Sequence, residues 1–390
     1  MSTLLSFLGK GRADLKTGYR IASYRFDAGF ARSVPFFGLA LNDYLKPDRL
    51  VLVGTAGSMW DVFFERAGGD DDAMLELMSA VEAGQVDDRL LDLPRLQLAA
   101  QLGIPVDCLL IPYARDAAEQ SEILRRLASV VQPGEHLSID VTHGFRHLPM
   151  LALVAARYLG RVVGVQIDEL YYGALEMTAD GETPVLRLGG LLAMLDWVDA
   201  LATYDKDGDY GVFAPLLAAD GMEKGRAELL ARAAYFERTS NPVRARETLS
   251  GVFSSVEAHA GALGGLFAET LRKRIDWFRG PKRDDWELSL ADAYRERGDY
   301  LRSATFLYEA FITRACFERP GNPNDFNDFK KRKDAYAVAR SEKPAVAQLE
   351  YLRNGLAHGV RPRNDQVVRT LDDENELRAA LKTLRKHLFP

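Results

Sequence analysis

The chain has 390 residues, with 50 Lys and Arg against 56 Asp and Glu and a formal net charge of −6. An apolar fraction of 47 % and a charged fraction of 27 % exclude a disordered, collagen-like or low-complexity chain, and the length predicts two or three domains. The two cysteines, Cys108 and Cys316, exclude a disulfide framework and a cysteine-rich zinc site. The negative charge argues against a general nucleic-acid coat but permits a local basic site.

Membrane insertion and export are both disfavoured. The stretch Leu148–Leu159 is about 12 residues long and contains Arg157, so it is too short and too charged to span a bilayer. The apolar run Leu4–Leu8 has no basic segment before it, so we expect no signal peptide. We therefore expect a cytoplasmic protein with no membrane partner.

Residues 1–190 alternate between short apolar β-rich runs and helical stretches, which predicts an α/β domain built on a Rossmann-like parallel sheet with helices on both faces. The expected strands are Leu4–Leu8, Arg49–Gly54, Val106–Pro112, Leu137–Val141 and Val162–Ile167. The expected helices between them are Val34–Leu45, Ala117–Val131 and Leu148–Leu159. A final hairpin, formed by residues 165–177 and 184–188, is expected to close this domain.

Residues 191–390 carry almost no strand signal. Their apolar residues recur at helical spacing between turn-forming segments, which predicts an all-α domain. Two stretches, 231–249 and 290–308, resemble each other, and both place small and aromatic residues around a short turn, as tetratricopeptide-like hairpins do. Because a solenoid needs more than two such units, we expect ordinary helix packing inside one α-domain.

Three loops that follow expected strands combine Gly with hydroxyl-bearing or basic side chains. Their candidate residues are Gly9, Lys10 and Gly11, then Thr55, Gly57 and Ser58 of GTAGSMWD, and Thr142, His143, Gly144 and Arg146 of DVTHGFRHLP. Ligands of parallel sheets bind at the carboxyl ends of the strands, where backbone N–H groups and hydroxyls can hold phosphate oxygens. The loops therefore predict a site for a phosphorylated or nucleotide ligand.

Each loop also has a purely structural interpretation. The glycines of the first loop lack the spacing of a dinucleotide or P-loop fingerprint. The polar residues of the second loop can instead cap a helix that begins near Met59. His143 and His147 have the spacing of a metal-binding pair, but no carboxylate or cysteine in that segment completes such a site, so we expect no metal.

The helical half contains RNGLAHG (353–359), which places Arg353, Asn354 and His358 after an apolar helical stretch. A histidine can transfer protons near neutral pH, and an arginine can stabilise charge that develops on a phosphate, so these residues suit metal-free RNA cleavage. Side chains five apart on a helix differ by about 140° in direction, so one copy is poorly suited to close a site, whereas two copies across a two-fold axis can form one composite cleft. The alternative is structural, with Arg353 in an intramolecular salt bridge and His358 at a helix end.

The two halves together resemble a known family, the ancillary ribonucleases of type III CRISPR systems, which join a CRISPR-associated Rossmann-fold (CARF) sensor domain to a helical HEPN ribonuclease domain. The segments SFLGKG, VLVGTAGSMWD and IDVTHGFRHLPML are similar to the CARF loops, and RNGLAHG is similar to the HEPN signature. Residues 197–217 are similar to the connection into the helical half. The resemblance covers nearly the whole chain and implies a CARF domain over 1–190 and a HEPN domain over 191–390.

The resemblance implies a cyclic oligoadenylate activator bound between two CARF domains, with the candidate residues of the three loops as its contacts. It further implies that Arg353 and His358 are the nuclease residues, that Asn354 supports them, and that the substrate is single-stranded RNA. We expect a homodimer or a higher even oligomer, with no cofactor besides the activator. A two-fold dimer best fits a ring with an even number of nucleotides, which favours a tetra- or hexa-adenylate. The hinge between the halves is expected near Gly189–Gly190.

Two other interpretations stay open. The chain can be a catalytically silent sensor of cyclic oligonucleotides whose helical half recruits RNA or a protein partner. Alternatively, the CARF pocket can also cleave its own ring, since Lys10, Ser58 and Thr142 are residues that can line a phosphodiester. Cleavage assays with RNA, and mass spectrometry of the ring, distinguish these possibilities.

Overall fold

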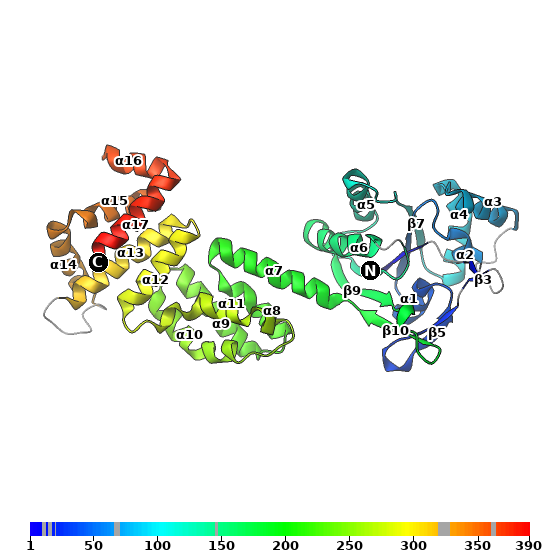
Figure 1. The fold of residues 1–390 in the computed structure, drawn as a ribbon, viewed down its shortest axis with the longest axis horizontal. Coiled ribbons are helices and arrows are strands. Elements are labelled where there is room, and N and C mark those ends of the chain that lie inside the picture. Colours follow the sequence, from blue (N-terminus) through cyan, green and yellow to red (C-terminus); the bar gives the residue numbers. More distant parts are fainter. Residues whose placement is uncertain are drawn as a thin grey trace. The chain divides into compact units, whose positions relative to one another are not determined.

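The structure is a computed structural model. It describes residues 1–9, 13–14, 18–19, 21–65, 71–144, 147–318, 328–359 and 364–390. The chain forms two compact units, Met1–Ala193 and Met194–Pro390 (Figure 1). It passes from the first unit to the second within helix α7 (Gly189–Asp207).

The first unit is built on an eight-stranded sheet with the order β5-β4-β10-β9-β8-β1-β6-β7. Its strands from β9 to β7 in this order run parallel to one another. Their bounds are β1 Ser2–Phe7, β6 Arg49–Gly54, β7 Val106–Leu110, β8 His136–Asp140 and β9 Gln166–Gly173. Because β1 lies between β6 and β8, the loops that follow these three strands lie side by side at one edge of the sheet.

The other side of the sheet is mixed. β10 (Glu182–Arg187) pairs antiparallel with β9, and β4 (Ala22–Arg25) and β5 (Ala31–Val34) extend the sheet beyond it. The expected hairpin is therefore confirmed, and β10 is the last strand of the unit in chain order, although β4 and β5 form the edge of the sheet. The strands β4 and β5 are short and partly polar, so they carry little of the apolar signal that marks a strand in sequence. A separate pair is formed by β2 (Ala13–Asp14) and β3 (Gly18–Tyr19).

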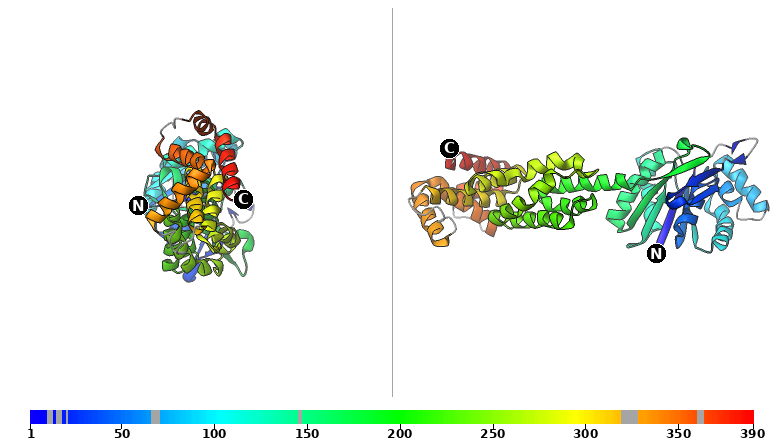
Figure 2. Two further views of the ribbon diagram at one scale, coloured as in Figure 1. Left: turned by 90° about the vertical axis from the view of Figure 1, so that its left-hand side faces the viewer. Right: turned by 90° about the horizontal axis from the view of Figure 1, so that it is seen from below.

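Helices cover both faces of the sheet, as Figure 2 shows in its right-hand view. One face is covered by α1 (Phe37–Leu45), α2 (Trp60–Glu65), α3 (Asp71–Ala83) and α4 (Asp88–Leu102), and the other by α5 (Ala117–Ser129) and α6 (His147–Tyr158).

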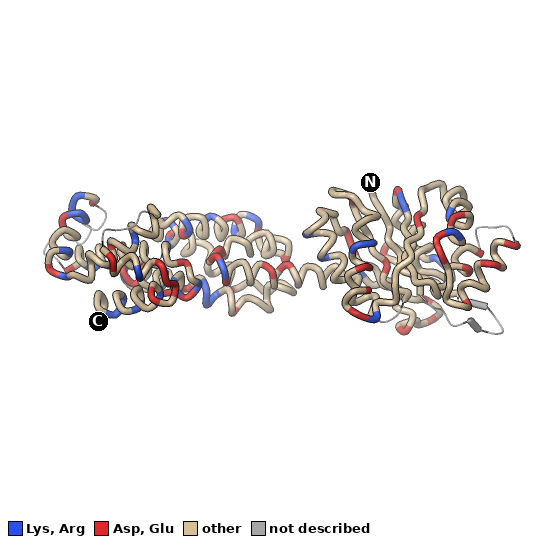
Figure 3. The backbone as a smooth tube through the Cα atoms, turned by 90° about the horizontal axis from the view of Figure 1, so that it is seen from above, with Lys and Arg blue, Asp and Glu red and all other residues tan. Residues whose placement is uncertain are grey.

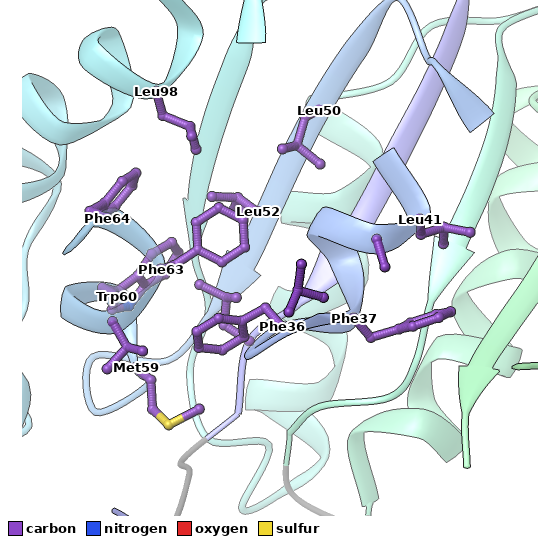
Figure 4. Close-up of a cluster of buried hydrophobic side chains, with 14 of the residues drawn as sticks. Phe36, Phe37, Leu41, Leu50, Leu52, Met59, Trp60, Phe63, Phe64 and Leu98 are labelled. Carbon is purple, nitrogen blue, oxygen red and sulfur yellow. The ribbon is translucent and has the colours of Figure 1, made fainter. Parts of the chain in front are cut away.

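Alternate strand residues supply the two cores, as the two-residue repeat of a strand requires. Leu50 and Leu52 of β6 pack with the aromatic side chains of α1 and α2 (Figure 4), whereas Val51 and Val53 face the opposite core. Strands that are buried on both faces read as continuous apolar runs, which is why the sequence predicted them. The expected α/β architecture is confirmed.

The expected strand at Val162–Ile167 is wrong in its first half. The helical winding of α6 continues through a π-helical turn, η2 (Leu159–Val163), and ends at Gly164, whose φ of 84° favours glycine. The Gly164 N–H donates to the Leu159 carbonyl, and β9 begins only at Gln166. The β-branched pair Val162 and Val163 favoured a strand, but such propensities are weak and the continuing helical hydrogen bonds prevail.

The second unit contains no strand in the residues that the structure describes there, so the all-α expectation is confirmed. Its first helices share a core around Trp197 and Leu230. After α7 these are η4 (Tyr210–Phe213), α8 (Ala214–Ala219), α9 (Lys224–Arg238), α10 (Pro242–Glu257), α11 (Gly264–Ile275) and η5 (Asp276–Arg279). Throughout the described ranges, every helix is too short or too polar to cross a bilayer.

A second core, around Leu290 and Leu349, joins the remaining helices. These are α12 (Arg283–Glu296), α13 (Tyr300–Phe317), α14 (Phe329–Glu342), α15 (Pro344–His358), α16 (Asp365–Asp372) and α17 (Glu374–Leu388). The helical unit is therefore organised around two cores.

The two similar stretches each fold as a helical hairpin, α9–α10 and α12–α13. In the first, the Asn241 side chain accepts the Arg244 N–H at the start of α10, and the Arg244 guanidinium lies 4.2 Å from the centre of the Phe236 ring. In the second hairpin the Asp299 side chain accepts the Arg302 N–H, and the Arg302 guanidinium lies over the Tyr294 ring. The three residues have the same spacing in sequence as their counterparts in the first hairpin. The resemblance in sequence therefore marks two related hairpins inside one helical unit.

Candidate functional site

The loops after β1, β6 and β8 make direct contact at the carboxyl edge of the parallel strands. A Cβ atom on Gly9 would lie 2.4 Å from the backbone nitrogen of Gly144, so only glycine allows the first and third loops to approach this closely. The second loop joins them, because the Met59 N–H donates to the Gly9 carbonyl at 2.9 Å. Loop segments that are far apart in sequence thus form one surface.

The hydroxyl groups of the second loop hold this surface together from inside. The Ser58 hydroxyl donates to the Leu8 carbonyl at 3.0 Å and accepts the Thr55 N–H at 2.9 Å, and the Thr55 hydroxyl lies 3.2 Å from it. Thr55 and Ser58 are only 1 % and 2 % exposed, and Gly57 is buried beneath the Tyr113 hydroxyl. In a single chain these residues shape the loop from below, ahead of α2, which begins at Trp60.

The third loop is fixed by a buried carboxyl group at the end of β8. Asp140 is fully buried, and its two oxygens accept hydrogen bonds from the Ser6 hydroxyl at 2.6 Å and the Thr142 N–H at 2.8 Å. Burial raises the pKa of Asp140 to about 6. The Thr142 hydroxyl in turn accepts the Gly173 N–H at 2.8 Å, which ties the loop to the end of β9.

The two histidines of the third loop bind separate partners. The His143 Nε2 accepts the Phe37 N–H at the start of α1 at 3.2 Å, and burial lowers the pKa of His143 to about 4, so the ring is neutral. His147 is exposed, and its Nε2 lies 2.9 Å from the Tyr113 carbonyl. Nowhere in the described ranges do three His, Cys, Asp or Glu side chains gather as a metal site requires.

Three of the expected ligand contacts, Lys10, Gly11 and Arg146, lie outside the described residues. Sequence reasoning overlooked Ser6 and Asp140, which lie beneath the third loop. Their signal was weak, because both strands contain other polar residues and Asp140 stands at the end of β8, next to the loop. Such a residue is a candidate for a buried hydrogen bond that positions a neighbouring loop.

The RNGLAHG motif forms the carboxyl end of α15. Pro344 starts this helix and Gly359, with φ 63°, follows its last residue, in the positions that these two residues favour. Val346, Leu349 and Leu352 are buried and attach α15 to the second helical core. This anchoring determines which way the polar residues of the motif face.

The three candidate catalytic residues differ in exposure. His358 is the last residue of α15 and is exposed, whereas Arg353 and Asn354 are half-buried. The Arg353 guanidinium donates to the Asn354 Oδ1 at 2.7 Å and lies 5.4 Å from the centre of the Tyr308 ring. The structure thus brings Arg353 and Asn354 together and leaves the imidazole of His358 facing solvent.

The charged side chains of the helical unit are of both signs, as the alternating blue and red segments in Figure 3 show. Around α15 several arginines are paired with carboxylates, for example Arg332 with Glu309 at 2.6 Å and Arg340 with Glu350 at 2.7 Å. For Arg353, the described residues provide no carboxylate within the 4.0 Å of an ion pair. The expected alternative, an intramolecular salt bridge of Arg353, is therefore not formed among the described residues.

Comparison with known proteins identifies the first unit. Residues 3–175 match the family model for the CARF domain of CRISPR system endoribonuclease Csx1. The chain is also 23 % identical over 345 residues to CRISPR-associated protein MJ1674 of Methanocaldococcus jannaschii, a match that covers 81 % of this chain and 54 % of that protein. The chain thus spans about half the length of this curated relative.

A Rossmann-like sheet with joined loops at its carboxyl edge, together with the family match over those loops, defines the first unit as a CARF domain. Over residues 3–175 the chain is accordingly similar to the CARF domain of a CRISPR system endoribonuclease, and over 345 residues it is similar to a CRISPR-associated protein. The resemblance drawn from the loop motifs is confirmed at this level.

Proposed function

We propose that the protein is a metal-independent endoribonuclease that cleaves single-stranded RNA. The helical unit acts as a HEPN domain, and two copies of α15 form one composite active site. A cyclic tetra- or hexa-adenylate, bound to two CARF domains, activates the nuclease. The observation that carries this proposal is that α15 presents both an exposed imidazole, His358, and an arginine, Arg353, that forms no ion pair with a described carboxylate.

The proposed reaction uses the substrate's own nucleophile. The RNA 2′-hydroxyl loses its proton and attacks the adjacent phosphorus, so that a bond from O2′ to phosphorus forms and the bond from phosphorus to O5′ breaks. The products are a 2′,3′-cyclic phosphate and a 5′-hydroxyl, which takes up a proton. His358 moves protons in this step, and Arg353 stabilises the charge that develops on the phosphate. Asn354 orients the Arg353 guanidinium through its side-chain oxygen.

A second copy of the chain is part of this proposal. Arg353 and His358 point about 140° apart on α15, so an isologous pair of helices supplies the groups that one helix cannot direct at a single phosphate. The first unit carries a patch that supports pairing, because Met150 and Val154, one turn apart on α6, are 72 % and 55 % exposed. Adjacent exposed apolar side chains of this kind can form part of the apolar patch that marks a protein interface.

The activator site is proposed at the joined loops of the CARF domain. Backbone groups near Gly9 and Gly144 lie where the loops meet, and the candidate residues of the other loops support them from below. A ring activates only if it binds the nuclease-competent conformation more tightly than the resting one. An even-membered ring can share the two-fold symmetry of two such domains.

A second candidate function is a silent sensor that recruits RNA or a protein partner. This alternative is favoured by the contacts of Arg353. Its guanidinium contacts the Tyr308 ring and the Asn354 side-chain oxygen of the same chain, as that of a structural residue would. Under this alternative the CARF domain binds the ring, but the helical unit leaves RNA intact.

The deciding experiment incubates the full chain with end-labelled single-stranded RNA and a panel of cyclic tri-, tetra- and hexa-adenylates, with EDTA present. We expect cleavage that depends on the tetra- or hexa-adenylate and survives EDTA. His358→Ala should lower the cleavage rate by about two orders of magnitude or more while ring binding persists. His387→Ala is the matched control, because His387 is another exposed histidine in the last turn of a helix, α17.

Three outcomes would contradict the proposal. Full activity of His358→Ala would remove the assigned catalytic residue, and a strict Mg²⁺ requirement would indicate another mechanism. Binding of a ring without any RNA cleavage would favour the silent sensor. Mass spectrometry of the ring after the same incubation tests whether the CARF domain also cleaves its ligand, since an intact ring excludes that activity.

A further inference from the structure

Arg353 is held differently from other arginines near α15. Arg332, Arg340 and Arg314 each bind a carboxylate, Glu309, Glu350 and Asp284 respectively, at 2.6 to 2.7 Å. The contacts of Arg353 are with neutral groups, the ring of Tyr308 on α13 and the side-chain oxygen of Asn354. Among the described residues, these contacts hold the guanidinium without an ion pair.

The Tyr308 ring is itself held in place by its neighbours. It packs against the ring of Tyr336 on α14, with the ring centres 5.1 Å apart and the planes tilted by 57°. Burial raises the pKa of the Tyr308 phenol, so the side chain stays uncharged at neutral pH. Three helices thus contribute to one arrangement: α14 supports the ring from α13, and that ring faces the guanidinium from α15.

Neutral support has a consequence for catalysis. A carboxylate partner would hold an arginine firmly, but it would compete with the phosphate for the guanidinium hydrogen bonds. An aromatic face attracts the cation through its quadrupole and restricts the side chain, while the N–H donors in the guanidinium plane remain available. A pre-oriented cation stabilises a developing charge better than one that must be ordered during the reaction.

We propose that Tyr308 is a positioning residue of the nuclease site, whose ring holds the Arg353 guanidinium ready for the scissile phosphate. This inference rests on the proposed ribonuclease function and adds a residue outside the RNGLAHG motif. Tyr308 acts through Arg353 and does not contact the RNA itself. Tyr336 serves the same purpose one step further away, by restraining the Tyr308 ring.

The test compares Tyr308→Phe, which keeps the ring, with Tyr308→Leu and Tyr308→Met, which remove it. For the Leu and Met variants, which lack the aromatic ring, we expect kcat for RNA cleavage to fall about 5- to 30-fold, as loss of a cation–π contact predicts. Their affinity for the cyclic oligoadenylate should be unchanged. Tyr308→Phe should stay within about 2-fold of the parent chain. Phe236→Leu is the matched control, because it removes the ring beneath Arg244 in the same unit and should leave kcat unaltered.

A second readout does not depend on activity. Phenylglyoxal labelling of Arg353, followed by peptide mass spectrometry, reports how firmly the guanidinium is held. Labelling should be several-fold faster in the Leu and Met variants than in the parent chain and in Tyr308→Phe. If the parent chain cleaves no RNA, the proposed function fails, whereas the labelling rates still decide whether Tyr308 holds Arg353.

Two results would overturn the inference. If Tyr308→Leu and Tyr308→Met cleave RNA at the parental rate, and phenylglyoxal labels their Arg353 at the parental rate, the tyrosine ring contributes nothing to the site. Equal impairment of Tyr308→Phe and Tyr308→Leu would mean that the hydroxyl group, and not the aromatic face, is what matters. The Met variant keeps the test decisive if the Leu variant folds poorly, because its flexible side chain fills the space of the lost ring.

Discussion

His143 shows at the scale of one residue how a candidate ligand group can also hold the fold. Its ring accepts the first N–H of α1 and packs edge-on against Phe36, with ring centres 5.5 Å apart. The hydrogen bond needs a neutral imidazole, because a protonated Nε2 cannot accept one. The pKa of His143, lowered to about 4, follows from this environment.

This pKa predicts an acid-sensitive contribution to stability. In the unfolded chain a histidine takes up a proton near pH 6.5, whereas in the folded protein His143 does so only near pH 4. The free energy of unfolding should therefore fall by about 2 kcal/mol between pH 7 and pH 4 through this residue alone. His143→Gln keeps an acceptor and should lose this dependence.

Urea unfolding at pH 7, 5.5 and 4.5 measures the effect. His387→Gln serves as the control, since His387 is exposed and should follow the parent chain. Parallel pH profiles for the parent chain and His143→Gln would contradict the role assigned to the neutral ring.

At the scale of elements, the two helical hairpins are joined by a buried carboxyl group. Glu237 of α9 is 4 % exposed, and one of its oxygens accepts the hydroxyl proton of Tyr294 from α12 at 2.8 Å. Burial raises the pKa of Glu237 to about 7, against the partly opposing effects of Tyr294 and Arg297. Glu237 thus connects the first helical core to the second.

The raised pKa predicts the opposite pH response to that of His143. The neutral carboxyl favours the folded state, so this stabilisation is complete below pH 4.5 and disappears as the pH rises through 7. Glu237→Gln should remove about 3 kcal/mol of pH dependence between pH 5 and pH 8. Glu257→Gln, at the exposed end of α10, is the control.

Thermal unfolding of both variants at pH 5 and pH 8 tests this prediction. The parent chain should be more stable relative to Glu237→Gln at pH 5 than at pH 8. A constant difference between the two chains would mean that Glu237 does not change its charge in this range.

At the scale of the whole molecule, activity in the proposed mechanism depends on pairing of two chains. Met150 and Val154 on α6 offer apolar surface that the described chain leaves exposed. Replacing both with Glu places charges where an interface would have to be dry, which is costly, whereas the exposed positions tolerate the change in a single chain. The double variant should therefore be monomeric and at least about tenfold less active.

Light scattering and the RNA assay on the same samples measure both effects. Leu266→Glu is the control, because Leu266 on α11 is 68 % exposed and lies outside α6. A double variant that still forms dimers would place the interface elsewhere, and a fully active monomer would contradict the composite site.

The sequence predicted the features that depend on local pattern. β6 was expected at Arg49–Gly54 and begins and ends there, because a strand buried on both faces must be continuously apolar. The RNGLAHG motif was expected on a helix, and α15 ends at His358 because Gly359 adopts a positive φ. By contrast, β4 and β5 escaped notice because the pairing of β4 with β10, and of β5 with β4, supplies the order that their own residues do not specify.

The sequence by itself determined the class of this protein. Its apolar runs and helical second half predicted an α/β domain followed by a helical unit, because these signals lie between neighbouring residues, and its loop motifs resemble those of CARF domains. The tertiary structure alone decided which polar groups are buried and what they bind: Ser58 beneath the first loop, Asp140 beneath the third, and Tyr308 against Arg353. These partners lie 45 or more residues apart, and only the packing of helices and strands brings such groups within hydrogen-bonding or stacking distance.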